Sequence, residues 1–222
     1  MHTVIQFYHN LFNISIIPVV KNASGFLDDA LSSCIHQTYR PIELVIFDDG
    51  STDDSLAVIG RWEKELVENG VRVRVQKSEA HISRGPGFAR NEAVIMSSGE
   101  FLCHLDADDR MHPDRIRLQL ELATEKGNNC LVGCNFDREP LDSTPFYARW
   151  LNEMDDKQLV IQQYRECTII CPSWFYHRDI FDKIAKFRSK SGRRAFVEST
   201  ENERIRRIPE DMYFFLDHLS SG

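Results

Sequence analysis

Almost unbroken apolar runs alternate along the chain with segments whose apolar residues recur at helical spacing. The runs Ile14–Val20 and Ile42–Phe47 are nearly all apolar, which is typical of parallel strands buried on both faces. Residues 71–76 alternate apolar and polar side chains, as in a strand with one wetter face. Further strands are predicted at residues 100–105 and 129–136. The pattern therefore predicts a sheet whose first two strands are central.

Helical spacing fills the gaps between these strands. Helices are predicted at residues 26–35, 55–69 and 87–99, and one with Pro113 in its first turn runs to residue 127, because a helix loses nothing by a missing N–H there. After Asn135 the signal thins. It predicts a helix pair within residues 143–164, a strand at residues 168–171, a turn at Pro172, then a helix, and a last helix at Pro209–Leu219.

This order of elements predicts an α/β fold with a mixed, mainly parallel sheet and helices on both faces. Ligand-binding loops of such sheets lie at the carboxyl ends of the strands. Two acid-rich loops fall at that edge, "DDGSTDD" after the second strand and "DADD" after the fourth. Neither contains a glycine-rich phosphate-binding motif.

Three carboxylates, Asp106, Asp108 and Asp109, lie within four positions at the end of a buried strand. A solvated turn that precedes a helix is one interpretation, since Asp is common in turns. The other is a cation site, because converging carboxylate oxygens favour Mg²⁺ or Mn²⁺. The second acidic loop at the same edge favours the cation, which would stabilise a phosphate leaving group.

Composition limits the class of protein. The chain has 222 residues and a net charge of −7, which argues against indiscriminate coating of nucleic acid. The first twenty residues lack the features of a secretory signal, and no run is long and apolar enough to span a bilayer. We therefore expect a soluble, cytoplasmic protein. The six cysteines are expected to be reduced core thiols and not zinc ligands, because Cys130/Cys134 and Cys167/Cys171 lack the shorter spacing of zinc ribbons. Each of these pairs is predicted to lie on one face of a strand.

Several linked blocks carry a family resemblance: "PVVKNASGFLDDALSSCIHQTY", "ELVIFDDGSTDDS", "GPGFARNEAVIMSSGEFLCHLDADDRMHPDR", "CPSWF" and "PEDMYFFLDHL". Together they resemble the inverting family 2 glycosyltransferases of GT-A (Rossmann-like) fold. The resemblance implies one catalytic domain over residues 14–219, with residues 1–13 unassigned. It also implies a UDP-sugar-dependent hexosyltransferase that uses Mn²⁺ or Mg²⁺.

The resemblance implies roles for the donor side of the site. Asp49 matches the carboxylate that reads the uracil, with Asp48 beside it as a weaker match. Arg90 and Asn91 match donor-pocket positions near the nucleotide. Asp106 matches the first Asp of the DxD motif, which faces the ribose or the waters of the metal.

On the metal and acceptor side, Asp108 matches the metal ligand. Asp211 matches the general base, with Glu210 as its partner, and one in-line displacement at the anomeric carbon requires such a base. Trp174 is either a platform for a sugar or base, or a core residue. Asp49, Asp108 and Asp211 are expected to converge on one cleft.

Within the family, stretches such as "SRGPGFARNEAV", "STPFYARWLNEM" and "PEDMYFF" are most similar to a subgroup described first as β-1,3-N-acetylglucosaminyltransferase-like and then as queuosine-tRNA galactosyltransferases. That similarity implies galactose transfer from UDP-galactose to queuosine in the anticodon of tRNA-Tyr. The alternatives are a UDP-GlcNAc or other UDP-hexose transferase that acts on a glycan or protein, and an inactive sugar-nucleotide-binding protein.

Three features depart from the family pattern: the sequence of the first strand, a basic insertion at residues 186–208, and the small number of residues after Leu219. Residues 186–207 hold eight Lys and Arg against three Glu, so they are read as a surface insertion or as a grip on tRNA phosphates. The few residues after Leu219 raise the alternative of a shortened acceptor site. An aspartate-nucleophile phosphatase is disfavoured, because its DxD motif would follow the first strand.

Overall fold

The computed structural model describes residues 12–79, 83–162 and 167–183. Their strands are β1 (Ile14–Val20), β2 (Ile42–Asp48), β3 (Val71–Lys77), β4 (Phe101–Asp106), β5 (Leu131–Val132) and β6 (Phe175–His177). The α-helices are α1 (Leu27–Ile35), α2 (Ser55–Glu68), α3 (Pro86–Met96), α4 (Arg115–Lys126), α5 (Pro145–Asn152), α6 (Asp156–Gln162) and α7 (Arg178–Lys183). A 3₁₀ turn, η1 (Cys171–Ser173), precedes β6.

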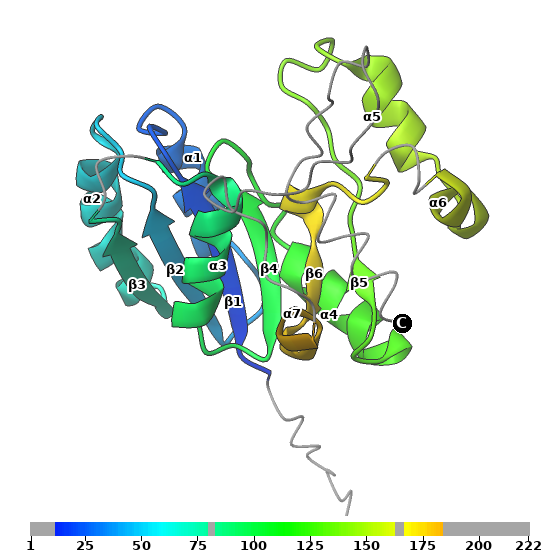
Figure 1. Ribbon diagram of the computed structural model, residues 1–222, viewed down its shortest axis with the longest axis horizontal. Coiled ribbons are helices and arrows are strands. Elements are labelled where there is room, and N and C mark those ends of the chain that lie inside the picture. Colours follow the sequence, from blue (N-terminus) through cyan, green and yellow to red (C-terminus); the bar gives the residue numbers. More distant parts are fainter. Residues whose placement is uncertain (1–11, 80–82, 163–166, 184–222) are drawn as a thin grey trace, which may run out of the picture.

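The strands form one sheet in the order β3-β2-β1-β4-β6-β5 (Figure 1). β1 to β4 are parallel to one another, whereas β6 runs antiparallel to both β4 and β5. The register pairs Val19 of β1 with Phe47 of β2 and with Asp106 of β4. The carboxyl ends of β1, β2 and β4 therefore meet at one edge, and the antiparallel β6 starts near that edge, so that η1 lies there too.

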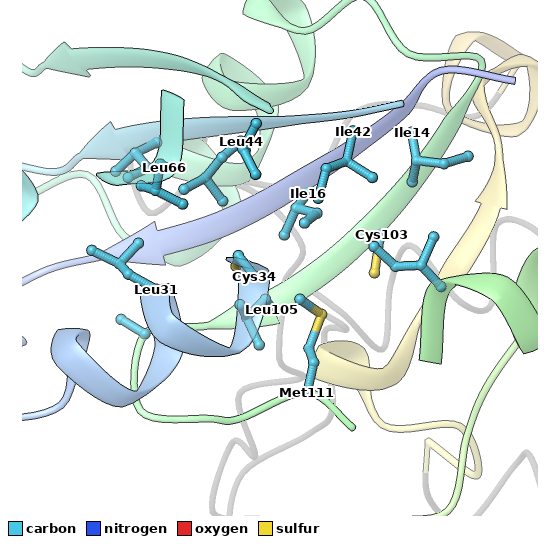
Figure 2. Close-up of a cluster of buried hydrophobic side chains, with 14 of the residues drawn as sticks. Ile14, Ile16, Leu31, Cys34, Ile42, Leu44, Leu66, Cys103, Leu105 and Met111 are labelled. Atoms are coloured by element: carbon cyan, nitrogen blue, oxygen red, sulfur yellow. The ribbon is translucent and has the colours of Figure 1, made fainter. Parts of the chain in front are cut away.

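Each face of the sheet has its own apolar cluster, because successive side chains of a strand point to opposite faces. On one face, Ile14 and Ile16 pack with side chains of α1, α2 and α4 (Figure 2). On the other face, Ile17 packs with side chains of α3, α7 and β6. The fold is thus a three-layer α/β/α arrangement, as predicted.

Helices α5 and α6 stand away from the sheet (Figure 1). Phe146 of α5 is 82% exposed and Ile161 of α6 is 68% exposed. Within the described part of the chain, every helix is too short or too polar to cross a bilayer.

The structure corrects the predicted elements in several places. Residues 168–170 are irregular, and the strand β6 follows Pro172 where a helix was predicted. The physical reason is that β6 completes the sheet by pairing with β4, which local periodicity does not report. β5 is only two residues long. Pro113 also lies outside the helix α4, which begins at Arg115.

All six cysteines are free, as expected. Cys34, Cys103, Cys167 and Cys171 are buried, whereas Cys134 is exposed. The predicted placement of each cysteine pair on one strand is wrong, because Cys130 and Cys134 flank the short β5, Cys167 lies in irregular chain and Cys171 lies in η1.

Candidate active site

The acidic cluster lies where β4 ends. Asp106 is the last residue of β4, and Asp108 and Asp109 follow in a turn in which the Asp109 N–H donates to the Asp106 carbonyl at 3.1 Å. Each residue offers one oxygen, and these oxygens all lie within 4.8 Å of one another. Three carboxylates at this spacing repel one another unless a cation or a proton intervenes. The donor set fits a hard divalent cation.

The electrostatics of the cluster support this fit. Burial, together with the charges of Asp106 and Asp108, raises the pKa of Asp109 to about 6. The positive charge of Arg115 acts in the opposite direction, but it does not offset the rise. Asp108 is exposed and Asp106 is half-buried. The cluster is therefore an open site whose negative charge is only partly compensated.

Arg90 of α3 braces the first Asp of the cluster. Its guanidinium donates from Nη2 to Asp106 Oδ1 at 3.0 Å, and the residue is 5% exposed. An ion pair at this depth fixes the orientation of the carboxylate. Asn91 follows on the same helix and is also buried. The structure thus brings Arg90 next to Asp106.

Asp49 directly follows β2, and its side chain is hydrogen-bonded to the segment that precedes α3. Its carboxylate accepts hydrogen bonds from Ser83 Oγ at 2.6 Å, the Arg84 N–H at 3.1 Å and the Gly85 N–H at 2.8 Å. Gly85 has φ +97°, a conformation that favours glycine. Because a carboxylate has about four lone-pair sites, acceptor capacity remains for a donor N–H.

Asp48 has a different role from its neighbour. It is fully buried, and its Oδ1 accepts the N–H groups of Gly50 at 3.0 Å and Ser51 at 2.8 Å. Among the described residues, no group donates to its Oδ2. Asp48 therefore shapes the turn of the "DDGS" loop.

Trp174 is fully buried in the cluster that contains Ile17, and its indole N–H donates to the Ile169 carbonyl. Of the two alternatives for this residue, the core position is the one found here, because a side chain without exposed surface presents no face to a ligand. Asp211, Glu210 and the basic insertion 186–208 lie outside the described residues. Convergence of Asp211 with Asp49 and Asp108 therefore stays a prediction.

Two residues beside the site, Arg115 and Gln119 of α4, were not predicted. Both are buried, and they share a helix face with Ile116, Leu120 and Ala123. A signal was present in the sequence, because polar residues at i and i+4 interrupt the apolar face of an amphipathic helix.

The glycosyl transferase family 2 model matches residues 15–185. GlyG of Streptococcus pneumoniae serotype 4 is 23% identical over 217 residues, which cover 93% of this chain and 69% of that protein. An uncharacterised glycosyltransferase of Haemophilus influenzae is 35% identical over 111 residues, which cover 50% of this chain and 42% of that protein. The chain therefore spans well under two thirds of the latter relative.

Solved structures share the architecture. The mannosyltransferase PcManGT of Pyrobaculum calidifontis, in complex with GDP-Man and Mn²⁺, aligns with a TM-score of 0.61 and 20% identity over 79% of this chain and 47% of its own. S. aureus TarS 1–349 in complex with UDP-GlcNAc aligns with a TM-score of 0.56 and 19% identity over 80% of this chain and 49% of its own. These likenesses confirm the GT-A fold. Because the family model covers most of the chain, the protein belongs to glycosyl transferase family 2.

Proposed function

We propose that the protein transfers a hexose from a UDP-sugar to an acceptor hydroxyl with the help of a divalent cation. The observation that carries the proposal is the convergence of Asp106, Asp108 and Asp109 at the carboxyl edge of the sheet, within 4.8 Å of one another. Family membership supports it, as do the UDP-GlcNAc and the Mn²⁺ named with two structural neighbours.

Asp108 is the proposed metal ligand, because it matches the metal-ligating Asp of the family's DxD motif and is exposed. The ion, Mn²⁺ or Mg²⁺, would stabilise the negative charge that develops on the diphosphate leaving group. Arg90 holds Asp106 at 3.0 Å, so that this carboxylate is oriented before the donor binds. Preorganisation of this kind lowers the cost of reaching the transition state.

The nucleotide is proposed to lie between the "DDGS" loop and the start of α3. Asp49 is the proposed acceptor of the uracil N3–H. Asp48 sets the turn that presents Asp49, and Arg90 and Asn91 line the nucleotide side of the pocket. In the structure, Asp49 is only 2% exposed. Donor binding therefore includes a small displacement of the Ser83–Gly85 segment.

Asp211 is the proposed general base, and Glu210 its partner. The base would take the proton of the acceptor hydroxyl while the hydroxyl oxygen attacks the anomeric carbon from the face opposite to UDP, which inverts that carbon. This part of the proposal depends on the sequence match of "PEDMYFF" alone.

The proposed donor is UDP-galactose, and the proposed acceptor is queuosine in the anticodon of tRNA-Tyr, in the cytoplasm. Similarity of the middle and C-terminal sequence to the queuosine-specific subgroup supports this choice. The eight Lys and Arg of residues 186–207 are a proposed contact for tRNA phosphates. The second candidate is UDP-GlcNAc or UDP-hexose transfer to a glycan or protein. The match to a chondroitin synthase of Pasteurella multocida, 31% identical over 133 residues that cover 60% of this chain and 13% of that protein, favours it.

The test is radiolabelled sugar transfer from UDP-galactose and from UDP-GlcNAc to tRNA with and without queuosine. We expect label only with UDP-galactose and queuosine-containing tRNA. Equal labelling of both tRNAs would reject the acceptor. Asp211→Asn should abolish transfer, whereas the matched control Asp217→Asn, in the same predicted helix, should not. Unchanged transfer by Asp211→Asn would show that Asp211 is not the general base. If the parent turned over no donor, the inactive sugar-nucleotide-binding alternative would be favoured.

A further inference from the structure

Arg115 and Gln119, one turn apart on α4, are buried polar side chains behind the acidic cluster. Arg115 is 8% exposed and Gln119 is 3% exposed. Long polar side chains are seldom buried to this extent unless their polar groups are satisfied. Neither residue belongs to the set of side chains proposed above to meet the donor.

Their hydrogen bonds join three separate segments of the chain. Arg115 Nη2 donates to the His104 carbonyl of β4 at 2.9 Å and to the Pro172 carbonyl of η1 at 2.8 Å. Gln119 Nε2 donates to the Ser173 carbonyl of η1 at 2.8 Å and to the Val132 carbonyl of β5 at 3.1 Å.

The two side chains also hold each other, because Arg115 Nε donates to Gln119 Oε1 at 3.0 Å. This contact restricts the rotamers of both side chains. Each one therefore helps to keep the other directed at its backbone carbonyls. We call this pair the α4 clamp.

The clamp reaches the two chain segments that border the site. His104 lies two residues before Asp106 on β4, and η1 leads into β6, whose Phe175 pairs with Cys103. The His104 N–H donates to the Trp174 carbonyl at 2.9 Å. The end of β4 and the η1 turn are therefore joined twice, by the Arg115 side chain and by the backbone hydrogen bond between His104 and Trp174.

The positive charge of Arg115 is not used in an ion pair with any described residue, because no carboxylate of that part of the chain lies within 4.0 Å of its guanidinium nitrogens. Backbone carbonyls and Gln119 are its hydrogen-bond acceptors. A buried cation without a carboxylate in direct contact is costly, although the charge of Arg115 still acts on Asp109 from a greater distance. A methionine would fill a similar volume without that cost.

We propose that Arg115 and Gln119 are positioning residues that fix the end of β4, and with it the acidic cluster, relative to the η1 turn on the other side of the site. The inference depends on the proposed metal-assisted transfer. A misplacement of about 1 Å at a reacting site can cost roughly 100-fold in rate. The clamp is the arrangement that prevents such a displacement.

The test compares the parent with Arg115→Lys, Arg115→Met and Gln119→Glu. Lysine keeps the charge but loses the planar fork that reaches two carbonyls. Glutamate keeps the contact with Arg115 but loses the donor to η1. The matched control is Ser15→Ala, which removes a buried 2.6 Å hydrogen bond to Glu43 at the opposite edge of the sheet.

Three readouts separate positioning from a merely structural role: the affinity for Mn²⁺ alone by electron paramagnetic resonance, UDP-galactose hydrolysis per folded molecule, and amide hydrogen exchange at residues 103–109 and 171–175. We expect clamp variants to lower kcat of hydrolysis about 10- to 100-fold, to weaken Mn²⁺ binding and to speed exchange in both segments. KM for UDP-galactose should change less than kcat. Arg115→Lys should lie between the parent and Arg115→Met. Ser15→Ala should lower the free energy of unfolding but leave Mn²⁺ affinity and kcat unchanged.

Parent-like Mn²⁺ affinity and kcat in folded clamp variants would overturn the proposal. If Arg115→Met does not fold, Arg115→Lys and Gln119→Glu still decide it. If the parent hydrolyses no UDP-sugar, the proposed function fails on its own, and Mn²⁺ affinity with exchange at the two segments still tests the clamp.

Discussion

The two edges of the sheet give their carboxylates opposite electrostatic environments. At the amino edge, Glu43 of β2 is fully buried, yet its pKa is lowered, because hydrogen bonds from Ser15 and Ser98 outweigh the effect of burial. At the carboxyl edge, the pKa of Asp109 is raised to about 6 by burial and by two neighbouring carboxylates. The first edge surrounds Glu43 with hydrogen-bond donors, whereas the second places Asp109 beside two like charges.

The amino edge is built for stability. Glu43 Oε1 accepts the Ser15 hydroxyl at 2.6 Å and the Gly99 N–H at 3.0 Å, and Ser98 donates to both carboxylate oxygens. A Cβ at Gly99 would lie 2.6 Å from the Ser15 amide nitrogen, so only glycine allows this approach. The comparison teaches that one fold can satisfy a buried acid completely at one edge of its sheet and leave neighbouring carboxylates in mutual repulsion at the other, where we propose that a cation binds.

The largest expected effect is the loss of the proposed metal ligand. Asp108→Asn should lower UDP-sugar hydrolysis or transfer by at least about 100-fold, because the charge on the leaving group is no longer stabilised. The rate is measured at saturating Mn²⁺. The exposed Glu125→Gln on α4 serves as the control and should keep the parent rate. A parent-like rate in Asp108→Asn would show that this carboxylate is not a metal ligand.

At the other edge, Glu43→Gln should cost about 2–4 kcal/mol of unfolding free energy, because hydrogen bonds to a buried charge are replaced by weaker ones and donors are left facing an amide. Turnover per folded molecule should not change. Denaturant unfolding measures the loss. Since the folded-state pKa of Glu43 is depressed, its contribution is present above the unfolded-state pKa and is lost as pH falls through the folded-state value. Equal losses for Glu43→Gln at neutral and strongly acidic pH would contradict this account.

The contribution of Asp109 to folding stability should depend on pH in the opposite direction. Its folded-state pKa is raised to about 6, so the metal-free protein is more stable below the unfolded-state pKa and loses that stability as pH rises through about 6. Asp109→Asn should therefore stabilise the metal-free protein by about 1–2 kcal/mol at pH 8, after allowance for solvent screening, and by less at pH 5. Thermal unfolding in a chelator measures this. Destabilisation at pH 8 would show that the cluster is not strained by its own charge.

The smallest effect concerns the arginines near Glu43. Arg72 Nη2 lies 3.9 Å from Glu43 Oε2, and its side chain is 59% exposed. Arg72→Gln should cost less than about 1 kcal/mol, because an exposed partner at this distance is well screened. A loss as large as that of Glu43→Gln would mean that the ion pair, and not the buried donors, holds the glutamate.

The parallel half of the fold was predictable because its strands are apolar runs bounded by turn residues. β1 occupies the predicted residues, and β2 extends the predicted run by one residue to Asp48. β6 was not predictable, because its three residues form a strand through pairing with Phe101–Cys103 and with Leu131–Val132. Short strands of this kind are selected by tertiary pairing instead of local pattern.

The site was predictable to the extent that its residues sit next to strand ends. Asp106 ends β4 and Asp108 and Asp109 follow within three residues, so the convergence of the three carboxylates comes from four consecutive positions. The Arg90–Asp106 ion pair joins two elements, and only the family resemblance pointed to Arg90. The three donors to Asp49 come from a segment more than thirty residues away, a contact that no local spacing reports.

The most direct test of the central claim is calorimetric titration of the purified chain with UDP, in Mn²⁺ and in chelator. The account predicts binding that is much tighter with Mn²⁺, and no such gain in Asp108→Asn. Equal UDP affinity in both buffers, or the same Mn²⁺-dependent gain in Asp108→Asn as in the parent, would contradict it.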